Sequence, residues 1–436
     1  MRIVQAAGWY LPSSKGGTEV YVSELARRLR SAGHEVLIAA PEALGQDERT
    51  YDDGGLKVYR YPIPVRVTRD EAQGRVAARG AERFHDWLRR AEPDVVHMHT
   101  YVTGLGLAEV RAAKALGARV IATTHSASLG FTCQRGTMMR WGTSLCDGLV
   151  APMKCAACQL QHRGVARPLA LAAATIPASV GALGRGIPGR LGTMIGMTDL
   201  ITFNQSAQRE MLDLVDRFVV LSEWARNVLI ANGAPADKVV LNRLGVRFPQ
   251  TPVPTRRSGA PVTVAYIGRF DPIKGVTDFA RAISMVPRST PIRFEFHGPV
   301  QFRTELAVVD RLKAIVGPDA WVHFGGELDD AGVRSVLTRV DVVCCPSRVV
   351  EGGPTVALEA HAAGVPVIGS DIPALSELVR DRVNGRLYPA GDARALADLL
   401  MELAEEPSLV DRWRAGLPTV RTMDDVTRDY LALYAA

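Results

Sequence analysis

The chain has 436 residues, with 52 Lys and Arg, 46 Asp and Glu, six Cys and 47% hydrophobic residues. This composition excludes a disordered chain and a disulfide-dense mini-protein, and the length suits about two to four domains. The net charge of +6 is small for this size. It is compatible with an acidic small molecule or a membrane surface as partner and argues against a nucleic-acid binder.

Neither a secretory signal nor a membrane-spanning segment is evident in the sequence. The apolar run that follows Met1 ends at Gly8, far short of a signal-peptide core. The most apolar stretch, Leu169–Gly184, is rich in Ala and is interrupted by Pro177, so it is too weak to span a bilayer by itself. We therefore expect a cytoplasmic protein with reduced cysteines, with at most a peripheral place at the inner face of the membrane.

Short apolar or β-branched runs alternate with longer amphipathic runs, which is the pattern of βαβ units around buried parallel sheets. The predicted strands are Arg2–Ala7, Glu35–Ala40, Asp94–Met98, Arg119–Thr124, Phe218–Leu221, Val262–Gly268, Ile292–His297, Trp321–Phe324, Asp341–Cys345 and Val365–Gly369. The predicted helices include Thr18–Ser31, Val276–Ser284 and Leu328–Arg339. Because the pattern occurs in two sets, we predict an α/β protein with two doubly wound domains.

A Pro-rich polar stretch, Phe248–Arg257, fits neither period and is predicted to connect the two domains. The first domain is then residues 1–247, the linker 248–260 and the second domain 261–422. A final helix, 423–436, begins with acidic residues that suit the positive end of its dipole, and we expect it to pack back on the first domain. Residues 130–199 break the alternation and are interpreted as an insertion in the first domain.

The first domain offers a glycine loop and three histidines as candidates for function. Gly16 and Gly17 precede a helix, so their backbone amides can approach an anion, although the loop is not GxGxxG and is only weakly Rossmann-like by itself. His97, His99 and His125 end buried strands. A histidine in that position is more often a hydrogen-bonded structural residue than a catalyst.

Four of the six cysteines lie close together in the interpreted insertion, at Cys133, Cys146, Cys155 and Cys158. Four thiolates can close a tetrahedral site, and the Cys-x2-Cys pair offers two ligands from one turn. Disulfides are the alternative, but a cytoplasmic setting argues against them. The spacing therefore predicts a metal centre, with Zn²⁺ and a 4Fe–4S cluster both open. The other two cysteines, Cys344-Cys345, lie within a predicted strand and are interpreted as core.

The segment from residue 160 to residue 200 is basic and weakly apolar. Its charged residues are four arginines and a single acid: Arg163, Arg167, Arg185, Arg190 and Asp199. Two interpretations stay open, namely contact with anionic lipid and an ordinary helical cap over a binding cleft.

One loop of the second domain carries a pair of cations. Arg269 and Lys274 follow a predicted strand through a glycine turn and precede a helix. An arginine can hold a phosphate in bidentate fashion and a lysine acts as a point charge, so the pair suits a diphosphate. A further turn, His297-Gly298-Pro299, ends the next predicted strand.

The strongest signal is the run from Pro346 to Ala360, which directly follows a buried strand and therefore lies where open α/β sheets bind ligands. Gly352-Gly353-Pro354-Thr355 opens a helix whose free amides form an anion site. Glu351 lies on the loop and Glu359 lies two turns into the helix. Carboxylates accept hydrogen bonds from hydroxyl groups, so these two suit a sugar and a ribose on either side of a diphosphate.

This ordered run resembles the Glu-x7-Glu signature of glycosyltransferase family 4, the glycosyl transferases group 1, whose members are retaining enzymes with the GT-B fold. The similarity continues through Val383–Leu387 and takes in the Gly-Gly loop of the first domain. It covers roughly Arg2–Thr124 and Phe218–Ala436 and leaves the cysteine-bearing insertion outside. The resemblance implies a GT-B fold, in which two Rossmann-like domains face a cleft.

The resemblance also implies roles for the candidate residues. Glu351 would contact the donor sugar, Glu359 would hold the nucleotide ribose, and Arg269 and Lys274 would neutralise the donor diphosphate. His125 matches the sugar-contacting histidine of the family, and with Glu351, Arg269 and Lys274 it completes the expected catalytic set.

The glycine-bearing loops would bind the rest of the donor. By the same resemblance, Gly16 and Gly17 would face the diphosphate, Gly298 would line the base pocket, and the helix start from Gly352 to Thr355 would bind phosphate. No catalytic divalent metal is implied, because cations and amides can stabilise the leaving phosphate.

The expected activity is therefore transfer of a sugar, with retention, from a UDP- or GDP-sugar to a sugar or lipid-linked acceptor. Such a reaction would serve cell-envelope, polysaccharide or glycolipid synthesis. One alternative is a different enzyme, either an inverting GT-B transferase or a Rossmann-type sugar-nucleotide enzyme. The second of these would need GxGxxG and a catalytic Tyr/Lys pair, which we do not find. The other is a non-catalytic metal-binding assembly subunit on a degenerate scaffold, which the intact Glu351 and Glu359 argue against.

Overall fold

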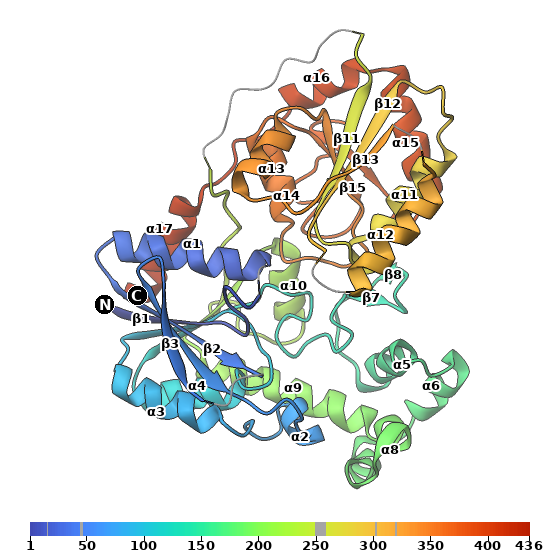
Figure 1. Ribbon diagram of the computed structural model, residues 1–436. Coiled ribbons are helices and arrows are strands. Elements are labelled where there is room, and N and C mark those ends of the chain that lie inside the picture. The colour runs from blue at the N-terminus through green and yellow to red at the C-terminus, as the bar shows by residue number, and fades with distance from the viewer. Residues whose placement is uncertain (15, 44–46, 249–258, 301–302, 319–320) are drawn as a thin grey trace. The chain divides into compact units, whose positions relative to one another are not determined.

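The computed structural model describes residues 1–14, 16–43, 47–248, 259–300, 303–318 and 321–436 (Figure 1). The chain divides into two compact units, which we describe separately. The first comprises Met1–Trp141, Cys146–Arg243 and Met423–Ala436, and the second comprises Gly142–Leu145 and Leu244–Thr422. The predicted linker, 248–260, falls mostly on residues 249–258, which lie outside the described part of the chain.

The first unit is built on an eight-stranded sheet of order β10-β9-β6-β5-β1-β2-β4-β3. All neighbouring strands are parallel except β3 and β4. Its strands are β1 (Arg2–Ala6), β2 (Glu35–Glu42), β3 (Arg49–Asp53), β4 (Leu56–Pro62), β5 (Val95–Met98), β6 (Arg119–Thr123), β9 (Arg217–Val220) and β10 (Val239–Leu241). The central strands are almost wholly buried, because helices cover both faces of the sheet.

Helices α1 and α17 lie on one side of this sheet, and α3 and α4 lie on the other (Figure 1). The helices of the unit are α1 (Gly17–Ser31), α2 (Arg69–Ala72), α3 (Ala81–Ala91), α4 (Leu107–Ala115), α5 (Pro152–His162), α6 (Arg167–Ala173), α7 (Ala178–Gly181), η1 (Ala182–Gly186), α8 (Gly189–Ile195), α9 (Met197–Leu214), α10 (Glu223–Ala231) and α17 (Met423–Ala435). The C-terminal helix α17 packs against α1, and Arg28 Nε donates to Asp424 Oδ1 at 2.7 Å. The two most distant parts of the chain thus share one core.

The segment interpreted as an insertion is mostly helical in the structure. Two short strands, β7 (Met139–Arg140) and β8 (Ser144–Leu145), precede the helices α5 to α8. Apolar residues of α5, α6 and α9 form a small core of their own, which includes Leu160, Ala170 and Leu200. Within the described residues, no single helix is long and apolar enough to cross a bilayer, although α6 and the Ala178–Gly186 stretch pass that criterion as a pair bent by 101°.

The second unit contains a parallel six-stranded sheet of order β13-β12-β11-β14-β15-β16. Its strands are β11 (Val262–Ile267), β12 (Ile292–His297), β13 (Val322–Phe324), β14 (Val342–Cys345), β15 (Val367–Ser370) and β16 (Gly385–Tyr388). Its helices are η2 (Pro272–Lys274), α11 (Val276–Met285), α12 (Arg303–Val316), α13 (Asp330–Leu337), α14 (Thr355–Ala362), α15 (Ala393–Glu405) and α16 (Ser408–Ala415). A core of Val, Ile, Leu and Phe side chains joins this sheet to α11, α12 and α15.

The predicted strands are present, with ends that differ by one or two residues, and the prediction of an α/β fold with two doubly wound sheets is confirmed. Sequence patterning missed the hairpin of β3 and β4, whose turn carries Gly54 and Gly55 in the left-handed region. It also missed β16, because Gly-Arg-Leu-Tyr has no apolar run, and β10, which is only three residues long. The predicted core cysteines, Cys344 and Cys345, are buried in β14.

Candidate functional site

The charged residues predicted in the second unit lie at the carboxyl ends of adjacent strands. Strand β11 pairs with β12 on one side and with β14 on the other, all parallel. Arg269 and Lys274 follow β11, Gly298 follows β12, and Glu351 follows β14. Parallel pairing therefore places the three loops along one edge of the sheet, where open α/β sheets bind ligands.

Within this edge, the predicted carboxylate and the predicted lysine touch. Lys274 Nζ lies 2.7 Å from Glu351 Oε2, and both side chains remain partly exposed. The hydroxyl of Ser347 donates to the other carboxylate oxygen, Glu351 Oε1. Arg269, on the loop after β11, is exposed, and in the described part of the chain it makes no ion pair. The site therefore presents an oriented carboxylate, a lysine shared with it and an arginine available to an anion.

Two contacts lock the loop after β11 against the loop after β14. Gly275 has a φ of +72°, and a Cβ on it would lie 1.6 Å from the carbonyl oxygen of Pro346. The backbone N–H of Arg348 donates to the carbonyl of Ile273 at 2.8 Å. The first contact requires glycine on both steric and conformational grounds. These contacts fix the spacing between Lys274 and the Glu351 loop.

Arg348 makes a further contact that holds the loop after β14 in place, and the sequence analysis missed it. Its guanidinium forms a bidentate pair with Asp278 on α11, with one N···O distance of 2.6 Å. Asp278 is buried, so this pair ties the loop before Glu351 to the helix that follows Lys274. The two residues are 70 apart in sequence, and no local pattern joins them.

Glu359 is held by a residue that the sequence analysis also missed. Arg247 Nη2 lies 2.9 Å from Glu359 Oε1, and its other terminal nitrogen lies 2.5 Å from Asp330. Burial raises the pKa of Glu359, and the hydrogen bond from Arg247 opposes that rise. A buried carboxylate kept beside a guanidinium is a suitable acceptor for hydroxyl groups.

The glycine positions of the second unit meet close backbone or side-chain neighbours. A Cβ on Gly298 would lie 2.0 Å from the carbonyl oxygen of Gly268, and one on Gly353 would lie 2.7 Å from Leu244. Helix α14 begins at Thr355, so its first amides point out of the helix without intrahelical partners. The run from Gly352 to Thr355 thus forms the predicted helix start, and Gly298 lies at the carboxyl end of β12.

In the first unit, the glycine loop leads directly into α1. Gly16 is the N-cap residue with extended backbone, and Gly17 is the first helical residue. Gly16 has no side chain with which to cap the helix. The hydroxyl of Ser14 donates to Glu19 Oε1 at 2.6 Å. The amides at this helix start are thus available to an anion, although the carboxylate of Glu19 lies close to Gly16.

His125 ends a hydrogen-bonded chain that sets its tautomer. His99 Nε2 lies 2.5 Å from Gln5 Oε1, and His99 Nδ1 lies 3.1 Å from His125 Nε2. The amide oxygen only accepts, so His99 donates from Nε2 and accepts at Nδ1. His125 therefore donates from Nε2 and keeps a lone pair on Nδ1. Burial lowers the pKa of His125 to about 3, so the ring is neutral at physiological pH.

His97 belongs to a buried polar network with the C-terminal helix. Its Nδ1 lies 2.6 Å from the hydroxyl of Tyr434, and its Nε2 lies 2.7 Å from Thr123 Oγ1. Tyr430 also reaches Thr123, at 2.8 Å. These contacts fit the structural interpretation of His97, and sequence analysis gave no sign that α17 supplies the partners.

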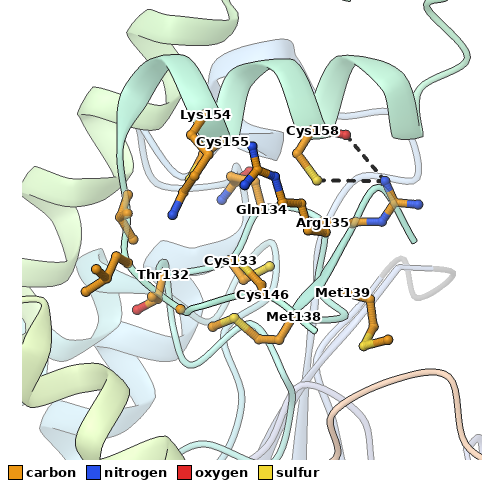
Figure 2. A pocket seen from close by; sticks show the side chains of 14 residues that line it. Thr132, Cys133, Gln134, Arg135, Met138, Met139, Cys146, Lys154, Cys155 and Cys158 are labelled. Atoms are coloured by element: carbon orange, nitrogen blue, oxygen red, sulfur yellow. Dashed lines mark hydrogen bonds between the residues drawn. The ribbon is translucent and has the colours of Figure 1, made fainter. Parts of the chain in front are cut away.

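The four cysteines of the predicted metal centre all line one small cavity of about 40 Å³ (Figure 2). Cys155 and Cys158 lie on helix α5, rather than on a turn that would form a zinc knuckle. Cys133 and Cys146 come from the loops before it. Nevertheless, among the residues that the structure describes, no group of three or more Cys, His, Asp or Glu is arranged to hold a metal ion.

The prediction of a preformed zinc or iron–sulfur ligand set at Cys133, Cys146, Cys155 and Cys158 is therefore not supported. The sulfurs have other partners: Cys158 Sγ accepts from the backbone N–H of Trp141 at 3.4 Å, and Cys146 Sγ donates to Asp147 at 3.6 Å. Burial also raises the pKa of the Cys146 and Cys155 thiols, which disfavours the thiolate that a metal needs.

Two family models match the chain, one in each unit. Residues 15–171 match the model described as Glycosyltransferase Family 4, and residues 261–406 match the model described as Glycosyl transferases group 1. The first match runs through all four cysteines of the insertion. The family resemblance was predicted to exclude the cysteine-bearing segment. The match does not support that prediction for the part of the segment up to residue 171.

Relatives of known function and a solved structure agree with these matches. The chain is 36% identical to a phosphatidyl-myo-inositol mannosyltransferase of Mycobacterium leprae over 37% of this chain and 42% of that protein. It is 24% identical to the enzyme of the same name from Mycobacterium tuberculosis strain H37Rv, over 94% of this chain and 89% of that protein. Anabaena HepE, solved in complex with UDP, has 14% identity, a TM-score of 0.63 and full coverage of both chains.

The solved structure supports the GT-B fold alone, whereas the family models and relatives concern the enzyme class. Together with the charged edge of the second unit, they show a glycosyltransferase with the GT-B fold, whose two units are each similar to a family model of the family 4, group 1 type.

Proposed function

We propose that this protein transfers a sugar from a UDP- or GDP-sugar to a lipid-linked or sugar acceptor, with retention of anomeric configuration. The observation that carries the proposal is the contact between Lys274 and Glu351 at 2.7 Å, at a sheet edge that also presents Arg269 and the start of α14. The UDP complex of Anabaena HepE supports the donor class. The phosphatidyl-myo-inositol mannosyltransferases support a lipid-linked acceptor and a role in envelope or glycolipid synthesis.

In the proposed mechanism, the bond from the anomeric carbon to the β-phosphate oxygen breaks as the acceptor oxygen bonds to the same face. Negative charge grows on the β-phosphate, and Arg269, Lys274 and the amides at the start of α14 stabilise it. The leaving phosphate takes the proton of the acceptor hydroxyl. The chain's own cations and amides supply the positive charge, so the proposal needs no catalytic divalent metal.

The remaining residues orient the donor. Glu351, already held by Ser347, accepts hydrogen bonds from the sugar hydroxyls, and Glu359 accepts from the ribose. His125 is neutral and offers the lone pair on Nδ1 to a sugar hydroxyl. We therefore assign His125 a role in binding and orienting the sugar, and not in acid–base catalysis.

A panel of UDP- and GDP-sugars tests the proposal, with donor hydrolysis and thermal stabilisation as readouts and NMR of the product anomer as the test of retention. We expect one donor to be hydrolysed and to raise the Tm, and Glu351→Ala to abolish turnover. The matched control is Glu405→Ala, an exposed glutamate at the end of α15. Full sugar transfer by Glu351→Ala would overturn the assignment of the site, and an inverted product would overturn retention.

A second proposal concerns the four cysteines. Thiols from three separate stretches of chain line one cavity, and this arrangement favours a zinc or 4Fe–4S centre. Such a centre would form only when the thiols lose their protons and the sulfurs move together. We expect anaerobically purified protein to hold about one zinc or about four iron per chain, lost in Cys146→Ser and kept in Cys344→Ala. Colourless wild-type protein without bound metal overturns this.

A third proposal is peripheral contact with an anionic membrane through helices α6 to α8. Leu169 is 62% exposed and Leu183 is 73% exposed, and arginines flank them. Such a surface suits the interface of an anionic bilayer. We expect cosedimentation with phosphatidylglycerol vesicles and not with phosphatidylcholine vesicles, with loss of binding in Leu169→Glu. Equal binding by that variant would contradict the proposal.

A further inference from the structure

The C-terminal helix α17 supplies a buried tyrosine to the hydrogen-bonded chain that ends at His125. The hydroxyl of Tyr434 lies 3.2 Å from Gln5 Nε2, and Gln5 Oε1 lies 2.5 Å from His99 Nε2. His99 in turn contacts His125 at 3.1 Å. Tyr434, Gln5 and His99 are all buried, so bulk water does not compete for these contacts. The helix at the end of the chain is therefore joined to His125 through Gln5 and His99.

The amide of Gln5 sets the direction in which these hydrogen bonds are donated. Its oxygen can only accept, and its NH2 group can only donate. In the structure, Oε1 accepts from His99 Nε2, so His99 Nδ1 accepts from His125 Nε2. An amide turned by half a rotation would donate to His99 Nε2, and the proton of His99 would then lie on Nδ1. His125 would accept that proton's hydrogen bond at Nε2 and carry its own proton on Nδ1. The orientation of one amide thus decides whether Nδ1 of His125 holds a lone pair or a proton.

Tyr434 stabilises the observed orientation of this amide, because its hydroxyl is also bonded on the other side. The hydroxyl oxygen lies 2.6 Å from Nδ1 of His97, and His97 Nε2 lies 2.7 Å from Thr123 Oγ1. Since Gln5 Nε2 donates to this oxygen, the single proton of the hydroxyl is left for His97 Nδ1. A rotated amide would present an oxygen to Tyr434, and the tautomer of His97 would have to reverse as well. Tyr434 therefore couples Gln5 to a second buried histidine.

A second tyrosine of α17 acts on the ring of His125 and not on its protons. Tyr430 is buried, and its hydroxyl accepts from the hydroxyl of Tyr21 at 3.2 Å. The ring of Tyr21 packs edge to face with that of His125, with the centroids 4.9 Å apart and the planes at 66°. Helix α17 thus contributes to the orientation of the imidazole ring as well as to the position of its proton.

We propose that Tyr434 is a positioning residue for sugar transfer, which acts through Gln5 and His99 to keep the lone pair of His125 on Nδ1. The inference rests on the proposed function, in which that lone pair accepts a hydrogen bond from a hydroxyl of the donor sugar. Without the hydroxyl of Tyr434, the NH2 group of Gln5 loses its acceptor, and the rotated amide is no longer opposed by His97. His125 then exists as two tautomers, and the one with a proton on Nδ1 cannot accept from the sugar.

NMR of the imidazole nitrogens tests the proposal directly, in the full chain labelled with ¹⁵N-histidine. The signals of His125 are assigned by their loss in His125→Gln. We expect the wild type to show His125 protonated at Nε2 alone and Tyr434→Phe to show both tautomers. A mixture in the wild type, or a single tautomer in Tyr434→Phe, overturns the proposal.

The matched control is Tyr61→Phe. Tyr61 is another buried tyrosine of the first unit, and its hydroxyl donates to the carbonyl of Gly104 at 2.6 Å. Both variants remove a buried hydroxyl, so an effect that merely followed stability would appear in both. We expect Tyr61→Phe to keep the single tautomer of His125, and the same mixture in this control would overturn the proposal.

Steady-state kinetics with the identified donor measure the consequence for transfer. We expect kcat/KM of Tyr434→Phe to fall about two- to tenfold, in proportion to the lost population of the competent tautomer, and that of Tyr61→Phe to stay at the wild-type value. Gln5→Leu removes the link itself, so adding Tyr434→Phe to it should lower kcat/KM no further. Additive losses in the double variant would show that Tyr434 acts by another route and would overturn the proposal.

The NMR measurement needs no substrate, so it distinguishes this inference from the proposed function. Sugar transfer by the wild type together with a single tautomer in Tyr434→Phe refutes only the inference. A tautomer change in a protein that transfers no sugar supports the coupling of Tyr434 to His125 and refutes the transferase site. A tautomer change with unaltered kcat/KM overturns the positioning role, because Nδ1 of His125 then does not contact the sugar.

Discussion

Replacing Arg247 by methionine tests how the second unit keeps a carboxylate charged in its interior. Glu359 is 8% exposed, and its Oε1 lies 2.9 Å from Arg247 Nη2. The side chain of Arg247 is 21% exposed and also reaches Asp330. Arg247→Met keeps most of the apolar length of the side chain but removes the guanidinium, so Glu359 remains in a poorly solvated site without its cation.

The expected cost follows from the burial of the two partners. Removing one partner of a fully buried ion pair costs about 3–5 kcal/mol. Because Arg247 is partly exposed, water can replace part of the lost interaction, and we expect a loss of about 2–3 kcal/mol at pH 8. For a domain of this size, that corresponds to a Tm lowered by roughly 4–12 °C in the transition of the second unit.

The loss of stability in Arg247→Met should depend on pH in a defined direction. Burial raises the pKa of Glu359 above its ordinary value of 4.5, so the folded state binds more protons than the unfolded state in the interval above that value. Stability from this group then falls as pH rises through the interval. Without Arg247 the pKa rises further, so the deficit of the variant grows from acid to neutral pH and nearly vanishes below about pH 4.5.

Scanning calorimetry at pH 5 and pH 8 checks this, with Arg247→Met/Glu359→Gln as the rescue variant. We expect the double variant to recover most of the lost Tm, because a neutral amide tolerates burial better than an unpaired carboxylate. Arg311→Met, which changes an exposed arginine of α12, is the matched control. An equal deficit at both pH values, or a double variant no more stable than the single one, would refute the reasoning.

Three further predictions concern charge. Lys274→Met should lower kcat by about 10²–10³-fold, because it removes a cation from the leaving phosphate. Steady-state kinetics check this, and an unchanged kcat contradicts it. Burial lowers the pKa values of His97, His99 and His125. Between its folded pKa and its unfolded pKa near 6.5, each histidine should therefore raise the free energy of unfolding by about 1.4 kcal/mol for every unit that the pH rises. The first unit should therefore lose Tm steeply from pH 7 to pH 5.5 in calorimetry, and a flat profile would exclude this. Arg348→Ala should destabilise the second unit by about 1–3 kcal/mol, because it leaves the buried Asp278 with only the longer contact to Arg281 at 3.6 Å, and denaturation at pH 8 that matches wild type would show otherwise.

Local patterning in the sequence was sufficient for most of the fold. Buried parallel strands are short continuous apolar runs, and the helices between them keep a 3.6-residue period, so both appear without knowledge of the partners. The strand ends in turn predicted where Arg269, Lys274 and Glu351 lie, because ligand sites of such sheets form at the carboxyl ends. The β3–β4 hairpin and β16 were missed, since they lack such runs.

The partners of the site residues could not be predicted from the sequence. Arg247 pairs with Glu359 across 112 positions, and His97 meets Tyr434 across 337. No periodicity connects such residues, because their proximity depends on the order in which the strands pair and on where the terminal helix packs. The tautomer and neutral state of His125 follow from the same long-range contacts, through Gln5 and His99.

The cysteines show most clearly what the sequence by itself predicts and what depends on the tertiary structure. Composition by itself excluded a disulfide scaffold, and spacing was enough to gather four thiols around one cavity. Tertiary structure decided the rest: two of them lie on a helix, and their sulfurs bond to neighbouring groups instead of converging. For these four thiols, the sequence thus predicted which groups meet, since their closeness along the chain limits how far apart they can lie. Their distances, protonation and partners depend on packing and burial, which only the folded chain sets.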